Sequence, residues 1–192
     1  ATTATTVACS GGVPATDFNP GRIDPTNAAF NTSRKPLVGE FTFNDQAIFV
    51  IGVHFSSKGG DDGLYGDVQP PVLYTEPQRT AQAQALADWV EATLRPLDPD
   101  VLLLGDFNTY EEEDPLALLR SRGFAPLLSG HYSYVYMGLS GALDHAYATP
   151  SLAGQVQGAL AWHVNADEPR VLDYTLAFKT DDRYEPTPYR AS

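Results

Sequence analysis

Four polar side chains lie at the end of, or within, segments that are predicted to be β-strands. They are His54, Asp106, Asn108 and Asp144. Together they supply an imidazole, two carboxylates and an amide, a set that suits hydrolysis of a phosphate ester. Asp106 would orient or deprotonate water or hold a cation, Asn108 would bind a phosphoryl oxygen, and His54 would protonate a leaving oxygen near neutral pH.

Residues 101–104 are expected to form the strand that positions Asp106. Four consecutive apolar residues predict a strand that is buried on both faces. In open α/β sheets, reactive groups gather where strands end at their carboxyl edge. If strand geometry continues to Asn108, its side chain points the same way as that of Asp106. Glycine, aspartate and asparagine also form ordinary turns, so a plain turn after residue 104 is the alternative.

The elements before this strand resemble the start of a βαβ unit. Residues 41–43 and 47–55 predict the two strands of a hairpin, and the apolar second strand leads to His54. A lone histidine of this kind is more often structural than catalytic. Residues 75–97 predict the longest helix, with an apolar stripe along one face and Thr75 as the first residue of a capping box.

The elements after this strand include the one that carries Asp144. Residues 114–122 predict a second helix, and the acidic run at 111–114 is assigned to capping of that helix rather than to metal binding. Residues 132–136 and 142–149 predict two further strands. Asp144 lies among alanines on one face of the second strand. It is either simply exposed to solvent or positioned there for a functional role.

Two loops are harder to interpret. The acidic stretch at 61–67 contains glycines and could bind Ca²⁺, but it lacks the spacing of an EF-hand, which favours an exposed polar loop. Residues 1–36 are rich in threonine, glycine, asparagine and proline and show no periodicity. We therefore expect residues 1–36 to form a loop or an extended lead-in.

Composition narrows the classes of function. The 192 residues suffice for one domain with a core, and the net charge of −12 argues against a nonspecific basic clamp on nucleic acid or an anionic membrane. Action on phosphates would require local lysine and arginine side chains or a divalent cation. The single cysteine, Cys9, excludes an intrachain disulfide, and no apolar run is long enough to span a bilayer.

The motifs in this order are similar to those of a known group of enzymes. Gly105-Asp106-Phe107-Asn108, preceded by His54-x-x-Ser57-Lys58-Gly59, resembles the endonuclease/exonuclease/phosphatase superfamily, the DNase I-like proteins. The segments 132–136, 141–146, 165–169 and 172–174 more closely resemble bacterial extracellular nucleases of the ExeM type. The resemblance runs from about residue 22 to the last residue.

The resemblance implies a fold and a set of roles. The family fold is an α/β (α+β) four-layer sandwich, and this chain would be about its second half, a mostly antiparallel sheet with two main helices. Asp106 and Asn108 would be catalytic or phosphate-binding, with Asp106 also a candidate metal ligand. His54 would lie near the scissile phosphate, and Asp144 would support a catalytic histidine. Lys58 is a weaker candidate for a phosphate contact.

The chain also departs from the family pattern. The asparagine motif and metal-binding glutamate of the family's first half are not found, and neither is the final Ser-Asp-His motif. We therefore expect residues 37–192 to be the C-terminal half of such a domain, truncated before its last motif.

These departures shape the functional expectation. The chain would be a fragment of a secreted or periplasmic bacterial phosphodiesterase, most specifically a nuclease acting on DNA or RNA. It would hold Mg²⁺, Ca²⁺ or Mn²⁺ loosely and be inactive alone. Its partners would be nucleic acid, the missing N-terminal half-domain and a second copy of itself. It would not bind a membrane. The alternatives are a non-catalytic binding or Ca²⁺-binding module, or a phosphatase of sugar or lipid phosphates.

Overall fold

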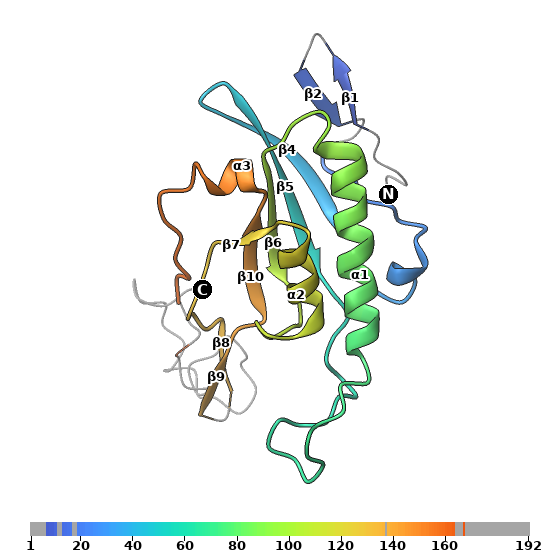
Figure 1. Ribbon diagram of the computed structural model, residues 1–192, viewed down its shortest axis with the longest axis vertical. Coiled ribbons are helices and arrows are strands. Elements are labelled where there is room, and N and C mark those ends of the chain that lie inside the picture. Colours follow the sequence, from blue (N-terminus) through green and yellow to red (C-terminus); the bar gives the residue numbers. More distant parts are fainter. Residues whose placement is uncertain (1–6, 11–12, 17–18, 137, 164–166, 168–192) are drawn as a thin grey trace, which may run out of the picture.

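The computed structural model describes residues 7–10, 13–16, 19–136, 138–163 and 167 (Figure 1). The elements in chain order are β1 (Val7–Ser10), β2 (Val13–Thr16), β3 (Gly21–Arg22), η1 (Ala28–Phe30), β4 (Leu37–Phe43), β5 (Gln46–His54), α1 (Glu76–Trp89), η2 (Val90–Leu94), β6 (Val101–Asp106), α2 (Asp114–Ser121), β7 (Ala125–Pro126), β8 (Tyr134–Tyr136), β9 (Leu139–Gly141), β10 (Asp144–Ala148) and α3 (Pro150–Ala153). No helix among these is both long and apolar enough to cross a bilayer.

The main sheet confirms the expected α/β class. Its strands lie in the order β3-β4-β5-β6-β10-β7. The β5–β6 pair is parallel and is joined through α1, as predicted for a βαβ unit, whereas the other neighbours are antiparallel. The pairs β1–β2 and β8–β9 form two separate two-stranded sheets.

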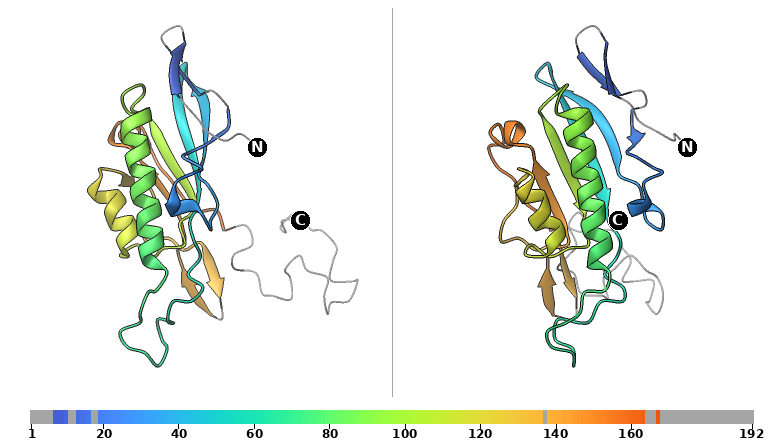
Figure 2. Two further views of the ribbon diagram at one scale, coloured as in Figure 1. Left: turned by 90° about the vertical axis from the view of Figure 1, so that its right-hand side faces the viewer. Right: turned by 45° about the vertical axis from the view of Figure 1, so that its right-hand side comes forward.

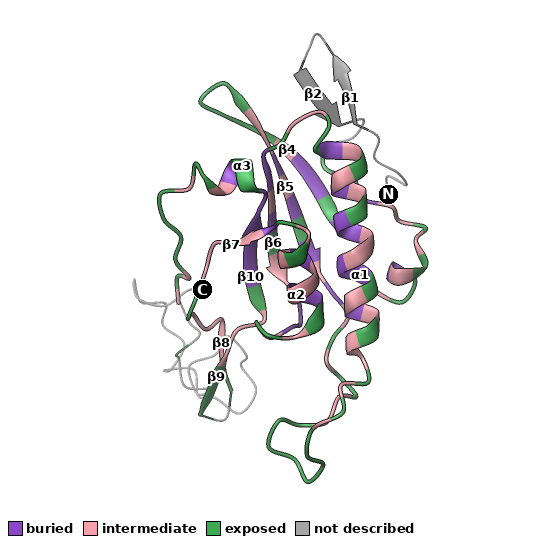
Figure 3. Cartoon of the chain, in the orientation of Figure 1, coloured by how far each residue is buried: buried purple, intermediate pink, exposed green. Residues whose placement is uncertain are grey.

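One face of the main sheet packs against α1 and α2, which lie together on the same side of it (Figure 2). The expected apolar stripe of α1 is confirmed, because Leu86, Val90 and Leu94 are fully buried in the core. From Val90 the helix continues as the π-helical turn η2. Burial is concentrated in the central strands and along α1 (Figure 3). The strands meet α1 through residues such as Phe49 and Leu103.

The other face of the sheet is more exposed, which corrects the prediction that residues 101–104 are buried on both faces. Val101 and Leu103 are fully buried, but Leu104 is 48% exposed and Leu102 is only half-buried. Side chains alternate across a strand, and α1 and α2 pack on one face only. The second face therefore carries half-buried and exposed apolar residues.

Part of the expected lead-in belongs to this fold. β3 pairs with β4 at the edge of the main sheet, and the side chains of Ile23 and Phe30 are fully buried in the core. Apolar residues separated by several polar ones give no periodic signal, so the loop interpretation missed them. The assignment of 37–192 as half of a larger domain stays a prediction, and residues 168–192 lie outside the described part.

Two further local expectations are corrected. Thr75 is the N-cap of α1 but makes no side-chain capping bond, because its hydroxyl oxygen accepts a hydrogen bond from Arg79 while its proton is donated to Asp61. The predicted strand at 142–149 begins two residues later, as β10, and it pairs with β6 and β7. The hairpin partner of β8 is β9.

Candidate active site

Strand register brings three of the four candidate residues into one row. His54 is the last residue of β5, Asp106 the last of β6, and Asp144 the first of β10. His54 pairs directly with Asp106 across the parallel strands, and Asp106 pairs directly with Asp144 across the antiparallel ones. Directly opposed residues share a face of a sheet. The row therefore lies on the more exposed face, at the carboxyl end of β5 and β6.

The His54–Asp106 pair is the closest contact within this row. His54 Nε2 lies 3.4 Å from Asp106 Oδ2, and the side chains are 41% and 32% exposed. The second carboxylate oxygen, Asp106 Oδ1, accepts a 2.8 Å hydrogen bond from the backbone N–H of Asn108. One oxygen thus fixes the carboxylate to its own loop and leaves the other facing the imidazole and solvent.

Asn108 belongs to the same strand end but not to the row. β6 stops at Asp106, and Asn108 has φ +48°, so strand geometry does not continue as the sequence interpretation required. Asn108 is buried, and its Nδ2 donates a 3.0 Å hydrogen bond to the carbonyl of Phe55. One amide N–H is therefore committed to joining the loop after β6 to the loop after β5. Its predicted role as a phosphate ligand remains a prediction.

Gly105 allows the two strands to approach at this point. It has φ +139°, and a Cβ built there would overlap the carbonyl oxygen of Val53 and lie 3.1 Å from its nitrogen. An L-residue rarely adopts this backbone conformation, so only glycine fits without strain. The glycine before Asp106 is thus required by the close approach of β5 rather than by a turn.

Two histidines beside Asp144 were missed in the sequence. His145 is buried on the opposite face of β10, and its Nε2 lies 2.8 Å from the carbonyl of Thr109. Burial lowers the pKa of His145, which favours the neutral imidazole. The ring of His131 stands perpendicular to it at 5.5 Å, and His131 Nε2 lies 2.9 Å from the carbonyl of Asp144. Only the alternation of residues along β10 hinted at the burial of His145.

Lys58 lies in a separate ionic cluster rather than free in solvent. Its Nζ is 2.5 Å from Glu113 Oε1, 3.7 Å from Asp61 Oδ2 and 4.9 Å from the centre of the Tyr110 ring. Arg79, with a fully buried side chain, lies 3.0 Å from Asp61 and 3.8 Å from Glu113. The ammonium of Lys58 is therefore already paired with carboxylates, and its predicted phosphate contact is untested.

The same cluster explains two of the acidic segments. Glu113 occupies the N-cap position of α2, one residue earlier than expected, and its carboxylate binds Lys58 rather than capping the helix. Burial by itself raises the pKa of Asp61, but hydrogen bonds from Thr75 and Arg79 outweigh it and lower the pKa. Asp61 is thus a structural anion and not the start of an open Ca²⁺ loop.

A bound divalent cation fits these residues only in part. Asp106 and Asp144 offer the oxygen ligands that Mg²⁺ prefers. Across the described ranges, however, no group of three acidic, histidine or cysteine side chains is placed to hold a metal ion. The described side chains therefore supply only part of the ligand set that a divalent cation needs.

Comparison of the sequence with family models gives one match. The model of the endonuclease/exonuclease/phosphatase family matches residues 12–177. No statistically significant match is found among curated proteins.

Solved structures show a distant likeness. One is beta toxin from Staphylococcus aureus, with 18% identity and a TM-score of 0.44, where the match covers 60% of this chain and 42% of that chain. Another is sphingomyelinase C from Streptomyces griseocarneus, with 16% identity and a TM-score of 0.44, where the match covers 62% of this chain and 43% of that chain. Humanized D. rerio TDP2 is a third, with 14% identity and a TM-score of 0.46, where the match covers 69% of this chain and 51% of that chain. The matched part of this chain thus spans 42% to 51% of those structures. A variant beta toxin was solved with bound magnesium ions.

Proposed function

This chain belongs to the endonuclease/exonuclease/phosphatase family, and we propose from this that its His54–Asp106–Asp144 row is part of the active site of a phosphodiesterase. The observation that carries the proposal is the register that aligns these residues across β5, β6 and β10 at one strand edge. A structural surface has no evident need for an imidazole and two carboxylates on three adjacent strand ends.

The chemistry follows from the geometry of the row. Asp106 Oδ2 lies 3.4 Å from His54 Nε2, where it orients the imidazole. A protonated His54 donates its proton to the oxygen that leaves phosphorus, the role of a general acid. Asp144 adds a second carboxylate that orients water or helps to hold a cation. A divalent cation, when bound, would offset phosphate charge, with ligands beyond the described residues.

The finer parts of the proposal concern substrate and setting. We propose that the substrate is nucleic acid and that the enzyme is a bacterial extracellular nuclease of the ExeM type, as the motifs in the sequence suggest. The net charge of −12 opposes binding of polyanions, and a cation at the phosphate would offset part of that repulsion. Mg²⁺ is our first choice, and Mn²⁺ and Ca²⁺ are the alternatives.

The test is hydrolysis by the full-length gene product with Mg²⁺ or Mn²⁺ added. Bis(p-nitrophenyl) phosphate and an oligonucleotide report diester cleavage, and p-nitrophenyl phosphate reports monoester cleavage. We expect Asp106→Asn and His54→Ala each to lower kcat for the diester at least about 100-fold. Glu112→Gln is the matched control, because the Glu112 side chain is 93% exposed and outside the row.

Two results would overturn this assignment. Full activity in Asp106→Asn and His54→Ala would remove the row from the active site, and cleavage of the monoester alone would indicate a phosphatase instead. The expectation that residues 1–192 alone are inactive stays a prediction, which the same assay on that chain tests.

A further inference from the structure

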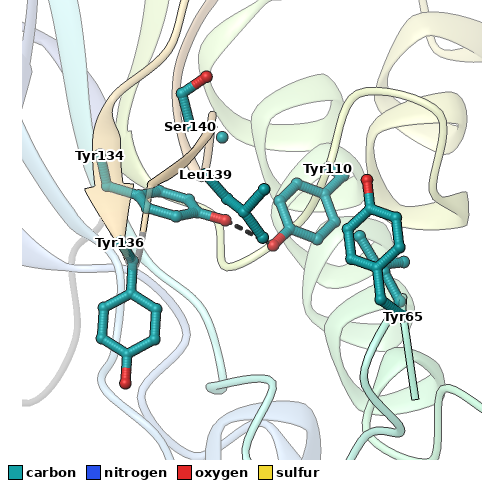
Figure 4. A pocket seen from close by; sticks show the side chains of 8 residues that line it. Tyr65, Tyr110, Tyr134, Tyr136, Leu139 and Ser140 are labelled. Atoms are coloured by element: carbon teal, nitrogen blue, oxygen red, sulfur yellow. Dashed lines mark hydrogen bonds between the residues drawn. The ribbon is translucent and has the colours of Figure 1, made fainter. Parts of the chain in front are cut away.

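A pocket of about 380 Å³ lies between the loop that follows β6, the β8–β9 hairpin and the long loop before α1 (Figure 4). Its lining is dominated by four tyrosines, Tyr65, Tyr110, Tyr134 and Tyr136. The volume falls within the range of small-molecule sites, about 300–1,000 Å³. Its lining does not include His54, Asp106 or Asp144.

The inner wall of the pocket is fixed by packing. Tyr134 lies across Gly141, its register partner on β9, and a Cβ at Gly141 would come within 2.6 Å of Tyr134 Cζ. The Tyr134 hydroxyl then meets the Tyr110 hydroxyl at 2.7 Å. Burial and this hydrogen bond raise the pKa of Tyr110, so its phenol stays neutral and adds no negative charge. Lys58 Nζ, 4.9 Å from the centre of the Tyr110 ring, places a cation beside this wall.

The chain holds the pocket close to the row. Tyr110 follows Asp106 by four residues and Gly141 precedes Asp144 by three. A residue spans at most about 3.5 Å of chain, so these pocket residues are within about 14 Å and about 10 Å of the row. A single extended substrate can therefore reach both the pocket and the row.

We propose that this tyrosine pocket binds an unpaired nucleobase of a single-stranded nucleic acid whose phosphodiester lies at the His54–Asp106–Asp144 row. The inference rests on the proposed function and names the form of its substrate. Bases stack on aromatic side chains with little regard to sequence. A base within a duplex is already stacked and paired and cannot enter, so the pocket selects single strands.

Binding of fluorescein-labelled oligonucleotides to the full-length gene product tests the proposal. The assay contains about 0.15 M salt to screen the repulsion between the acidic protein and the strand, and EDTA to suppress hydrolysis. The probes are a thymidine decamer, the same decamer with all bases removed, and a duplex. The abasic strand has the same phosphates, so the difference in affinity between the decamer and the abasic strand measures the contribution of the bases. The variants are Tyr65→Ala and Tyr136→Ala, whose residues are 85% and 57% exposed and whose truncation spares the core.

The control variants separate stacking from general loss of structure. Tyr65→Phe and Tyr136→Phe keep the rings, and Tyr74→Ala removes an equally exposed tyrosine that does not line the pocket. We expect tighter binding of the decamer than of the abasic strand or the duplex. Each alanine variant at the pocket should weaken decamer binding about 5- to 150-fold while leaving the abasic strand unaffected. The phenylalanine variants and Tyr74→Ala should bind like the wild type.

The outcomes distinguish the two proposals. Equal binding of the decamer and the abasic strand, or no effect of the alanine variants, would overturn the base pocket, and diester hydrolysis would still stand. No binding of any oligonucleotide also overturns it, and binding of phosphatidylcholine–sphingomyelin vesicles instead would indicate a lipid substrate. Absence of diester hydrolysis in the earlier assay would overturn the function itself.

Discussion

Replacement of Gly105 by alanine should separate the strands that form the candidate site. Gly105 has φ +139° and pairs with Val53 in the neighbouring parallel strand, one residue before the His54–Asp106 pair. A Cβ at this position overlaps the Val53 carbonyl oxygen. Both obstacles are backbone features, so no rotation of a side chain relieves them.

The magnitude follows from these two obstacles. An L-residue in such a sparsely populated backbone region costs of order 1–3 kcal/mol. The overlap must also be relieved by moving β6 from β5, which weakens at least one hydrogen bond worth roughly 1 kcal/mol. We therefore expect Gly105→Ala to lower the free energy of unfolding by about 3 kcal/mol, a large part of the 5–15 kcal/mol typical of a domain. The shift should also lengthen the His54–Asp106 contact and lower diester hydrolysis.

Urea denaturation followed by circular dichroism measures the loss. Gly52→Ala is the matched control, because Gly52 lies one residue before Val53 on the same strand and a Cβ there meets only the Leu37 carbonyl, at 3.8 Å. That variant should unfold within about 1 kcal/mol of the wild type. If Gly105→Ala is as stable as Gly52→Ala, the close approach of β5 and β6 does not hold and the geometry argued for the site fails with it.

Three further changes test other parts of the structure. Arg79→Leu should lower the free energy of unfolding by about 3–5 kcal/mol, because it leaves the buried carboxylates of Asp61 and Glu113 short of a cation. Urea denaturation measures this loss, and little change would show that the ionic cluster does not stabilise the fold. The pKa of Asp61 is lowered in the folded state, so its contribution to stability is present above about pH 4 and is lost as the pH falls through the folded value. Thermal unfolding between pH 6 and 2.5 should therefore show a steeper acid loss in the wild type than in Asp61→Asn, and parallel curves would contradict the shift. Gly141→Ala should displace the Tyr134 ring and reduce decamer binding more than abasic-strand binding, and fluorescence anisotropy of the labelled strands measures both.

Much of the scaffold could be predicted because its signals are local. The apolar stripe of α1 repeats at helical spacing, and the runs around Phe49 and Val101 predict strands wherever they pair. The position of His54 and Asp106 at adjacent strand ends followed from the βαβ arrangement, in which parallel neighbours end at the same edge.

The rest depended on contacts between distant segments. The pairing of β10 with β6, which places Asp144 opposite Asp106, is chosen by the whole sheet and not by the residues near Asp144. The ion pair between Lys58 and Glu113 joins loops that are 55 residues apart, so no local sequence pattern predicts it. The exposure of Leu104 is set by which face the helices cover, a property of the assembled layers.

The alignment of the row by strand register has a consequence for how such a protein tolerates insertions and deletions. Loss of one residue within β6 would turn Asp106 to the opposite face, because side chains alternate with a period of two. Changes of length in the loop before α1 or at the β8–β9 tip leave the register untouched. Sequence drift can therefore remodel the loops around the row, while β6 itself must keep its length.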